Sequence, residues 1–589
     1  MRTKLLLLAS AALAVAIPAI AQQVAQTQPA PNQYPNGGIG AQSPQPQPQP
    51  STAAANLGGG ADESAVEVVT QSNLQPAQPV QPPIEYPGWA RRDPWVVGKL
   101  DPASEGLGDN PWGGASGAFL TTLMRRMDAP IASRWAHIAL RDALLAKARA
   151  PRDVNPIDWV AERSWLLLRM GEADAARMLV DGVDTDRFTP KMLQVAVQSA
   201  LANADAAALC PLEAGIRKYD PRIRQFVQAM CASLAGDSDN ASAQIDNARR
   251  YGRIGGIDLA LTEKVIGASG SGRAATIEWE PVENLTAWRF GLSAATGMLP
   301  PDRLINGASP RLRAFQARAP LLTPQQRLPS AMIAAGLGVF SSQSMVDLYS
   351  AIYDATDPSD LPSTDSWQLR QAFVGKDEPT RLAAIRHVLE LGKEGLQKEA
   401  ARALAARAAT LVTPDSKLSK EAPDLISAML AAGYDRAAAR WIPAVGGMDD
   451  QANDRCWAML ALAAPDIADV GTGRINSFIR HDNSPQKVRS AFLVAGLAGL
   501  GRISTDTANS YNRRYHLGLG ATTSWTKMID ASAGRGQAGS VLVLAGTGFQ
   551  TPDWTKVPPS HLYHAISALK RTGQDFKARM IAAEALSRT

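Results

Sequence analysis

Residues 155–177 read NPIDWVAERSWLLLRMGEADAAR and show how this chain builds its helices. Asn155 is a favourable N-cap, and Pro156 occupies the first helical position, where a missing N–H costs no hydrogen bond. Apolar or small residues then recur with the 3.6-residue period of one helix face. After Gly171 a second amphipathic segment begins at once, so the stretch predicts two helices joined by a tight turn. The residues on the first face are Ile157, Val160, Ala161, Ser164, Leu167 and Leu168.

The same start signal recurs from about residue 116 to residue 589, where strand signals are almost absent. A capping residue followed by proline marks the start of a helix. We therefore predict an all-α fold, in which short amphipathic helices pack on one another. The further cap-proline pairs are Thr189-Pro190, Asp220-Pro221, Thr323-Pro324 and Thr413-Pro414.

Six of the predicted joints between helices can be aligned on a glycine, which permits a tight turn. An alanine five residues later lets the second helix approach the first closely, and it is present in four joints. Gln397 and Asp506 break the pattern in the other two. The glycines are Gly171, Gly236, Gly392, Gly433, Gly501 and Gly573, and the alanines are Ala176, Ala241, Ala438 and Ala578.

These joints resemble those of tetratricopeptide-like helical hairpins, most clearly in residues 168–177 and 430–438. The resemblance covers joints and not whole units, because the family's period of about 34 residues and its Trp and Tyr positions are absent. It implies an irregular α-solenoid of stacked hairpins over residues 116–589, with a concave surface for partners. The Gly/Ser-rich stretch 267–272 marks a candidate break in this body, near residues 267–282.

Residues 1–21 have the pattern of a secretory signal peptide. Basic residues precede an apolar stretch, and a small-x-small site predicts cleavage between Ala21 and Gln22. A membrane anchor is the rival interpretation, but Pro18 and the small residues favour cleavage. No later run of about 18 uncharged apolar residues is present, so we predict no transmembrane segment after signal removal. We expect export to the periplasm, with secretion as the alternative.

Two segments without helix signals follow. Residues 22–85 are mostly Gln, Pro, Ala, Asn and Gly, which predicts a disordered tether. Residues 86–115 predict an extended strap whose aromatic side chains pack onto the helical body, with an aromatic sugar-binding surface as the alternative. The aromatic residues of the strap are Tyr86, Trp89, Trp95 and Trp112.

The cysteines agree with an oxidising compartment. Cys210 and Cys231 flank the predicted turn at Asp220-Pro221 symmetrically, so antiparallel helices on either side would bring the sulfurs together. We predict a disulfide between them, and two buried free thiols are the alternative. Cys456 lies on an apolar helix and is expected to be a buried small residue.

Charge and composition narrow the functional classes. The chain has 60 Lys+Arg, 55 Asp+Glu and a formal net charge of +5, with 45% hydrophobic residues. This balance does not favour nucleic acid as a partner, and a wholly disordered chain is excluded. Arg134, His137 and Arg141 share one face of an early helix, which we interpret as a solvated surface, with a surface for an anionic glycan or lipid as the alternative.

One acidic and aromatic cluster is the candidate ligand surface. Glu278, Trp279 and Glu280 precede Trp288, and carboxylates between tryptophans can grip or protonate a glycan. A helix start with acidic residues near its N-terminus explains the same residues. The cluster supports an alternative function, in which the protein binds or cleaves peptidoglycan.

Other catalytic and cofactor patterns are incomplete. Ser524 and Lys527 have the spacing of a penicillin-recognising serine enzyme, but the later elements are missing. Residues 534–539, GRGQAG, match a dinucleotide fingerprint at a predicted turn between helices. His561 and His564 share a helix face without a third zinc ligand. We therefore predict no catalytic residue, cofactor or metal, and expect a non-catalytic exported scaffold that binds protein partners of the cell envelope.

Overall fold

The computed structural model describes residues 87–589, except for residues 129, 220, 252–254, 272–274 and 468–469. The predicted signal peptide, its cleavage site between Ala21 and Gln22, the tether and Tyr86 lie outside the described residues. The described part of residues 93–589 belongs to one compact unit. Residues 87–92 belong to a second unit.

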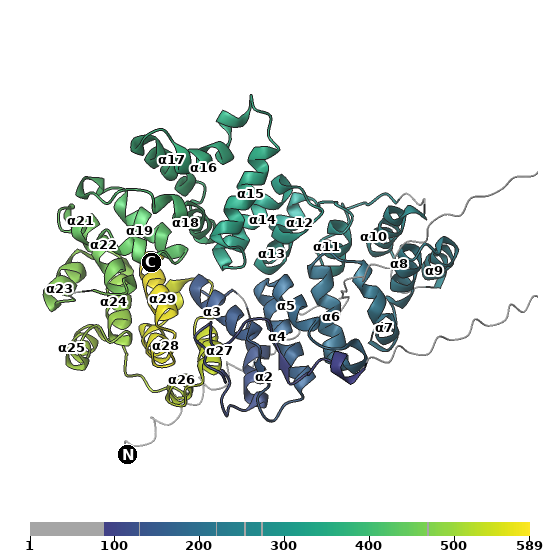
Figure 1. The fold of residues 1–589 in the computed structure, drawn as a ribbon, viewed down its shortest axis with the longest axis horizontal. Helices are drawn as coiled ribbons and strands as arrows, with labels where there is room; N and C mark the ends of the chain where they lie inside the picture. The colour runs from purple at the N-terminus through teal and green to yellow at the C-terminus, as the bar shows by residue number, and fades with distance from the viewer. Residues whose placement is uncertain (1–86, 129, 220, 252–254, 272–274, 468–469) are drawn as a thin grey trace, which may run out of the picture. The chain divides into compact units, whose positions relative to one another are not determined.

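The compact unit is all-α, as the sequence predicted (Figure 1). Within the described residues, the only strands are β1 (Val96–Val97) and β2 (Ala148–Arg149), which pair antiparallel. Helices that follow one another along the chain pack as hairpins in many places. These pairs are α4 with α5, α8 with α9, α13 with α14, α16 with α17, α18 with α19 and α28 with α29.

The helices are short throughout. Up to residue 354 they are α2 (Gly117–Arg126), α3 (Arg134–Leu145), α4 (Pro156–Met170), α5 (Ala173–Val180), α6 (Pro190–Ala202), α7 (Glu213–Tyr219), α8 (Arg224–Leu234), α9 (Ser238–Tyr251), α10 (Ile257–Ile266), α11 (Ala287–Ala294), α12 (Asp302–Asn306), α13 (Pro310–Arg318), α14 (Pro324–Leu337) and α15 (Ser342–Asp354).

After residue 354 the α-helices are α16 (Asp365–Val374), α17 (Glu378–Glu390), α18 (Gly395–Ala409), α19 (Ala422–Ala431), α20 (Asp435–Ala439), α21 (Ile442–Val445), α22 (Asp450–Ala463), α23 (Thr472–His481), α24 (Val488–Gly499), α25 (Thr505–Tyr515), α26 (Ser524–Gly534), α27 (Ala538–Gly548), α28 (Pro559–Arg571) and α29 (Asp575–Ser587). The short 3₁₀- and π-helices are η1 (Gly88–Ala90), η2 (Thr185–Arg187), η3 (Ala207–Leu212), η4 (Gly267–Ser271), η5 (Leu361–Ser363), η6 (Ser416–Leu418), η7 (Pro485–Lys487) and η8 (Trp554–Lys556).

Three of the cap-proline pairs lie at the start of an α-helix, as predicted. Asn155, Thr189 and Thr323 each accept a hydrogen bond from a backbone N–H in the first turn of α4, α6 and α14. The signal at Thr413-Pro414 is wrong, because only the short turn η6 follows it. The proline at position 221 precedes a turn, and α8 begins at Arg224.

The joints between helices require glycine for two different reasons, a left-handed backbone conformation and a close approach of two backbones. Five of the six have φ between +65° and +90°, the left-handed conformation that glycine tolerates best. Gly392 is not in that region, but a Cβ there would lie 2.0 Å from the carbonyl oxygen of Gln397, so close approach requires glycine. The alanines five residues after a joint glycine, Ala176, Ala241, Ala438 and Ala578, are all 0% exposed.

The last helices of the chain pack against the first ones, which the local joint pattern does not reveal. Both α27 and α29 contact α3 (Figure 1). Glu584 of α29 accepts hydrogen bonds from Ser133 Oγ at 2.6 Å and from the backbone N–H of Arg134 at 2.7 Å. A carboxylate from the end of the chain therefore caps the N-terminus of α3.

Buried arginines bind carbonyl groups near the C-terminal ends of neighbouring helices. Arg163 is 0% exposed and donates to the carbonyl oxygens of Leu144 at 2.9 Å, Ala146 at 3.2 Å and Val97 at 2.7 Å. Burial lowers the pKa of Arg163 to about 9, and no described carboxylate pairs with it. Its stabilising role is therefore to satisfy carbonyl groups that the helix leaves without partners.

The prediction that Arg134, His137 and Arg141 form a solvated face is wrong. Arg134 is 4% exposed and His137 is 1% exposed, because α5, α14, α27 and α29 all pack against α3. Arg134 donates to two carbonyl oxygens, while His137 and Arg141 lie 3.1 Å and 3.5 Å from Glu172. Polar residues at helical spacing here form a buried network.

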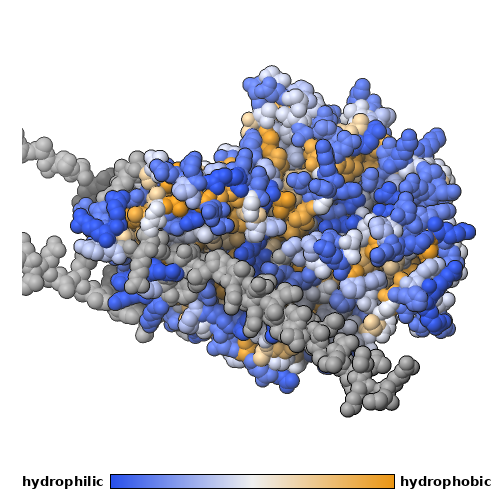
Figure 2. All heavy atoms as spheres, turned by 180° about the vertical axis from the view of Figure 1, so that it is seen from behind, coloured by the Kyte–Doolittle hydropathy of each residue, from blue (hydrophilic) through white to orange (hydrophobic). Residues whose placement is uncertain are grey.

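The surface is mostly polar. Where described residues are visible in Figure 2, hydrophilic areas predominate and the hydrophobic area is divided into separate patches. Within the described residues, no helix has the length and apolar character needed to cross a bilayer.

Candidate functional site

The sequence-predicted ligand surface is divided between the interior and the solvent. Glu278 and Glu280 are exposed, whereas Trp279 is 8% and Trp288 is 1% exposed. Trp288 stacks on Phe226 with a centroid distance of 6.1 Å. The indole rings of Trp279 and Trp288 are both covered by protein, so the structure does not form the aromatic surface on which a glycan would stack.

The strap aromatics differ in environment. Trp112 is fully buried and meets Trp159 edge to face, with centroids 4.9 Å apart. Trp95 is 39% exposed and has the guanidinium of Arg149 5.2 Å above its ring. In the second unit, Trp89 is 88% exposed.

The predicted disulfide is confirmed. Cys210 in η3 and Cys231 in α8 are bonded, with their Cα atoms 5.5 Å apart. Cys456 is a buried free thiol, as expected, and burial raises its pKa to about 12. A thiol with such a pKa is protonated at neutral pH and is a poor nucleophile.

The histidine pair is occupied by structural contacts. His561 lies 3.1 Å from the carbonyl oxygen of Gly548, and His564 lies 2.9 Å from Asp530. Across the described residues, no group of three or more metal-ligating side chains is assembled. Residues 535–537 join α26, which ends at Gly534, to α27, which contains Gly539, and this confirms the predicted turn between helices.

A groove among α17, α18 and α19 is the candidate functional site. Its volume is about 370 Å³, within the usual range of ligand sites. Four apolar side chains and seven charged ones line it. The apolar residues are Leu382, Ile385, Leu389 and Leu425, and the charged residues are Arg386, Glu390, Lys398, Arg402, Lys420, Glu421 and Asp424.

Helix α18, which contributes one side of the groove, is packed closely against its neighbours. Eight buried positions of α18 are alanine or leucine, and α14, α15, α16, α17 and α19 all contact this helix. A Cβ on Gly336 of α14 would lie 2.1 Å from the carbonyl oxygen of Leu396, at the start of α18. Glycine at position 336 therefore allows the backbones of α14 and α18 to approach.

Some charged residues of the groove form ion pairs within the protein, and others do not. Arg386 lies 3.7 Å from Glu421, which bridges α17 to the residues preceding α19. Arg402 is 4% exposed and lies 2.5 Å from Glu399, so its charge is compensated inside the protein. Lys398 and Lys420 are exposed, and no described carboxylate forms an ion pair with them. The rim therefore offers charges of both signs above an apolar floor.

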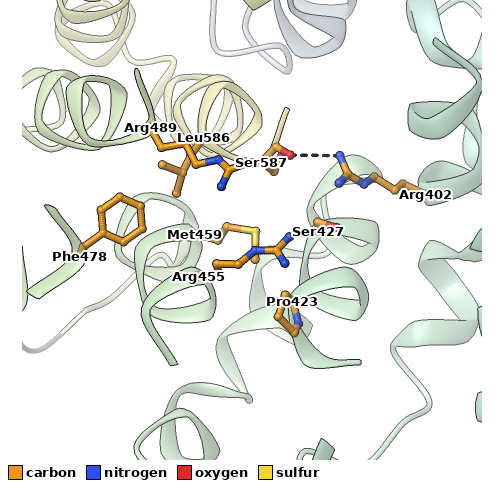
Figure 3. A pocket seen from close by; sticks show the side chains of 9 residues that line it. All are labelled: Arg402, Pro423, Ser427, Arg455, Met459, Phe478, Arg489, Leu586 and Ser587. Carbon is orange, nitrogen blue, oxygen red and sulfur yellow. Dashed lines mark hydrogen bonds between the residues drawn. The ribbon is translucent and has the colours of Figure 1, made fainter. Parts of the chain in front are cut away.

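A second, smaller pocket shares Arg402 with the groove (Figure 3). Its volume is about 30 Å³, and α18, α19, α22, α23, α24 and α29 contribute side chains. Figure 3 shows Arg455 and Arg489 directing their guanidinium groups into the space between them. The other lining residues are Pro423, Ser427, Met459, Phe478, Leu586 and Ser587.

Asp482 organises the turn before α24. Its two carboxylate oxygens accept four hydrogen bonds, from the backbone N–H and hydroxyl groups of Ser484 and Ser490. Burial alone would raise the pKa of Asp482, but these hydrogen bonds outweigh it and lower the pKa. The turn between α23 and α24 is thereby held in one conformation.

Sequence reasoning missed both the groove and the pocket. Leu382, Ile385 and Leu389 have the spacing of one helix face, and that local signal was present. The residues opposite them come from α18 and α19, whose placement depends on contacts between distant helices. No family model, curated protein or solved structure matches the chain, so its candidate site is defined by its own geometry alone.

Proposed function

We propose that this protein is a non-catalytic, exported helical scaffold whose groove among α17, α18 and α19 holds a polypeptide segment of an envelope protein. The observation that carries the proposal is the groove itself, with its apolar floor and charged rim. Apolar side chains supply buried area to a bound segment, and rim charges set its position and direction. Periplasm is the proposed compartment.

The disulfide supports export. Cys210 and Cys231 are bonded in the folded protein, and such bonds persist in oxidising compartments and are rare in the cytosol. A scaffold in such a compartment needs a surface that recognises partners without a small-molecule cofactor. The groove has that character because apolar residues line it and five of its seven charged residues are exposed.

Site-specific crosslinking in cells tests the proposal. A photoreactive amino acid is placed at the exposed positions Lys398 and Lys420 beside the groove, and at exposed Lys527 on α26 as the control. The same positions are used in a Leu389→Asp background, which places a charge on the apolar floor. Leu411→Asp, at an exposed leucine outside the groove, is the matched control.

We expect positions 398 and 420 to capture one defined protein, with at least tenfold more product than position 527. The capture should disappear in Leu389→Asp and persist in Leu411→Asp, while both variants keep the wild-type melting temperature within about 4 °C. The purified partner should bind Leu389→Asp at least tenfold more weakly. Equal capture at all three positions, or capture of cell-wall fragments in place of protein, contradicts the proposal.

A further inference from the structure

The apolar surface that a partner can reach in the groove follows one helix. Leu382 of α17 is 8% exposed and Leu389 of the same helix is half-buried, whereas Ile385 and Leu425 are 0% exposed. Leu382 and Leu389 are seven residues apart, which places them on one face of α17, two helical turns or about 10 Å from each other. The accessible part of the floor is therefore a narrow apolar row along α17.

An extended segment would find few backbone partners in this groove. Peptides that bind as strands pair with the free edge of a sheet. In the part of the chain that the structure describes, the only strands are β1 and β2, and neither contributes to the groove. Nine of the eleven lining residues lie inside α17, α18 or α19, where most backbone hydrogen bonds are made within the helix. An extended segment would therefore bury backbone N–H and C=O groups without partners, whereas a helix satisfies its own.

Two other modes of peptide recognition need residues that the groove does not offer. Proline-rich segments bind between aromatic side chains, and the four apolar residues that line this groove are all aliphatic. Phosphorylated motifs bind clusters of free arginine. Here Arg386 lies 3.7 Å from Glu421, and Arg402 lies 2.5 Å from Glu399, so both arginines are already paired. Of the common recognition modes, a helix lying in a groove is the one that these side chains fit.

The exposed charges of the rim have both signs. The positive ones are Arg386, Lys398 and Lys420, and the negative ones are Glu390 and Asp424. Arg386 and Glu390 are four residues apart, so the two charges lie one turn apart on the helix that also carries the apolar row. A helix lying along α17 meets both charges if its own acidic and basic side chains are spaced by one turn beside its apolar residues.

We infer that the partner's segment binds as an amphipathic α-helix that lies along α17, with its apolar side chains on Leu382 and Leu389. This inference rests on the proposed function and adds the conformation and the residue pattern of the partner to it. Apolar residues at positions i, i+3 or i+4, and i+7 of the segment face the floor. An acidic side chain lies beside Arg386, and a basic one lies beside Glu390. The groove thereby recognises a helical pattern of apolar and charged residues.

Peptide display on the purified full chain tests the inference. A library of random peptides of about 16 residues, enough for four helical turns, is selected against the wild type and four variants. Leu389→Asp places a charge on the floor, and Leu411→Asp is its control at an exposed leucine outside the groove. Glu390→Lys reverses one rim charge, and Glu283→Lys makes the same change at an exposed position outside the groove. Melting temperatures check that all four variants are folded.

We expect the wild type and both controls to enrich peptides with apolar residues at i, i+3 or i+4, and i+7, and Leu389→Asp to lose this enrichment. Glu390→Lys should keep the apolar spacing and lower the frequency of Lys and Arg beside it by about threefold. Equal frequencies of Lys and Arg in the wild-type and Glu390→Lys pools would overturn the placement of the helix along α17.

Proline substitution in one selected peptide tests the helix directly. Proline is tolerated in the first turn of a helix and disrupts its middle. We expect proline at the central position to weaken binding to the wild-type protein by about tenfold or more, and proline at the first position to change it by less than about threefold. Equal losses at the two positions, or a selected pool with apolar residues at i and i+2, would overturn the inference and leave the groove proposal standing. Absence of any enriched peptide, or equal binding of the selected peptides to Leu389→Asp and the wild type, would overturn the groove proposal and the inference with it.

Discussion

The carboxylate of Glu584 accepts a hydrogen bond from the backbone N–H of Arg134 at 2.7 Å, across 450 positions of sequence. The same carboxylate binds Ser133 and the guanidinium of Arg588, the latter at 2.7 Å. We predict that Glu584→Ala lowers the free energy of unfolding by about 3 kcal/mol, because it leaves buried donors and a buried charge without a partner. Denaturant unfolding at neutral pH measures the change.

A matched control for this substitution is Glu278→Ala. Glu278 is exposed, and surface substitutions change stability by about 0.5 kcal/mol or less. Glu584→Gln should fall between the two, since an amide oxygen can still accept hydrogen bonds while the charge is lost. Equal stability of the two alanine variants would show that the contact between α29 and α3 contributes little.

The disulfide is expected to stabilise the region around α8. Cys210 and Cys231 are separated by 21 positions, and closing a loop of that size contributes about 3 kcal/mol in the chain-entropy description. We predict that the double variant Cys210→Ser/Cys231→Ser unfolds at lower denaturant by that amount. In non-reducing mass mapping of the unfolded wild type, alkylation should appear on Cys456 alone; alkylation of Cys210 or Cys231 would contradict the bond.

The turn before α24 should give stability that depends on pH. The pKa of Asp482 is lowered in the folded protein, so its contribution is present above the unfolded-state value of about 3.9 and is lost as the pH falls through the folded-state value. We predict that Asp482→Asn costs about 2 kcal/mol at pH 7 and much less at pH 3. Urea midpoints at both pH values measure this, with exposed Asn483→Ala as the control. A cost that is equal at both pH values would rule out the carboxylate as its source.

Two glycines provide a matched pair for the packing of α18. At Gly336 a Cβ would lie 2.1 Å from the Leu396 carbonyl oxygen, whereas at Gly473 it would meet nothing within 4 Å. We predict that Gly336→Ala destabilises the protein by about 3 kcal/mol through overpacking. Gly473→Ala, within α23, should stabilise it by about 0.5 kcal/mol through helix propensity. Thermal unfolding compares them, and equal effects would mean that α14 and α18 do not approach this closely.

Local features of the fold were predictable from the sequence. Gly171 and Ala176 have a fixed spacing because one residue makes the turn and the other lies at the contact between the two helices, and both requirements are local. Cys210 and Cys231 were predictable for a similar reason, since the turn between them is short. Such predictions need only the geometry of two consecutive helices.

The candidate site was not predictable in the same way. The groove is lined by side chains from three helices and from the residues before α19, and no local period encodes how these helices lie relative to one another. For Trp279 the sequence suggested a surface that the structure does not form. Tryptophan is common both in glycan-binding surfaces and in protein interiors, so the residue type alone does not distinguish the two. The exposed positions on either side, Glu278 and Glu280, alternate with buried Trp279, and that alternation was the signal that favoured burial.

The cap that Glu584 places on α3 has a consequence for the proposed export of the protein. A chain that crosses a membrane from its N-terminus delivers α3 first and residue 584 almost last. During that interval the backbone N–H groups at the start of α3 have no carboxylate to bind, and α27 and α29 are absent from its sides. If the protein is exported as proposed, the packing of α3 is therefore completed only after α29 has emerged.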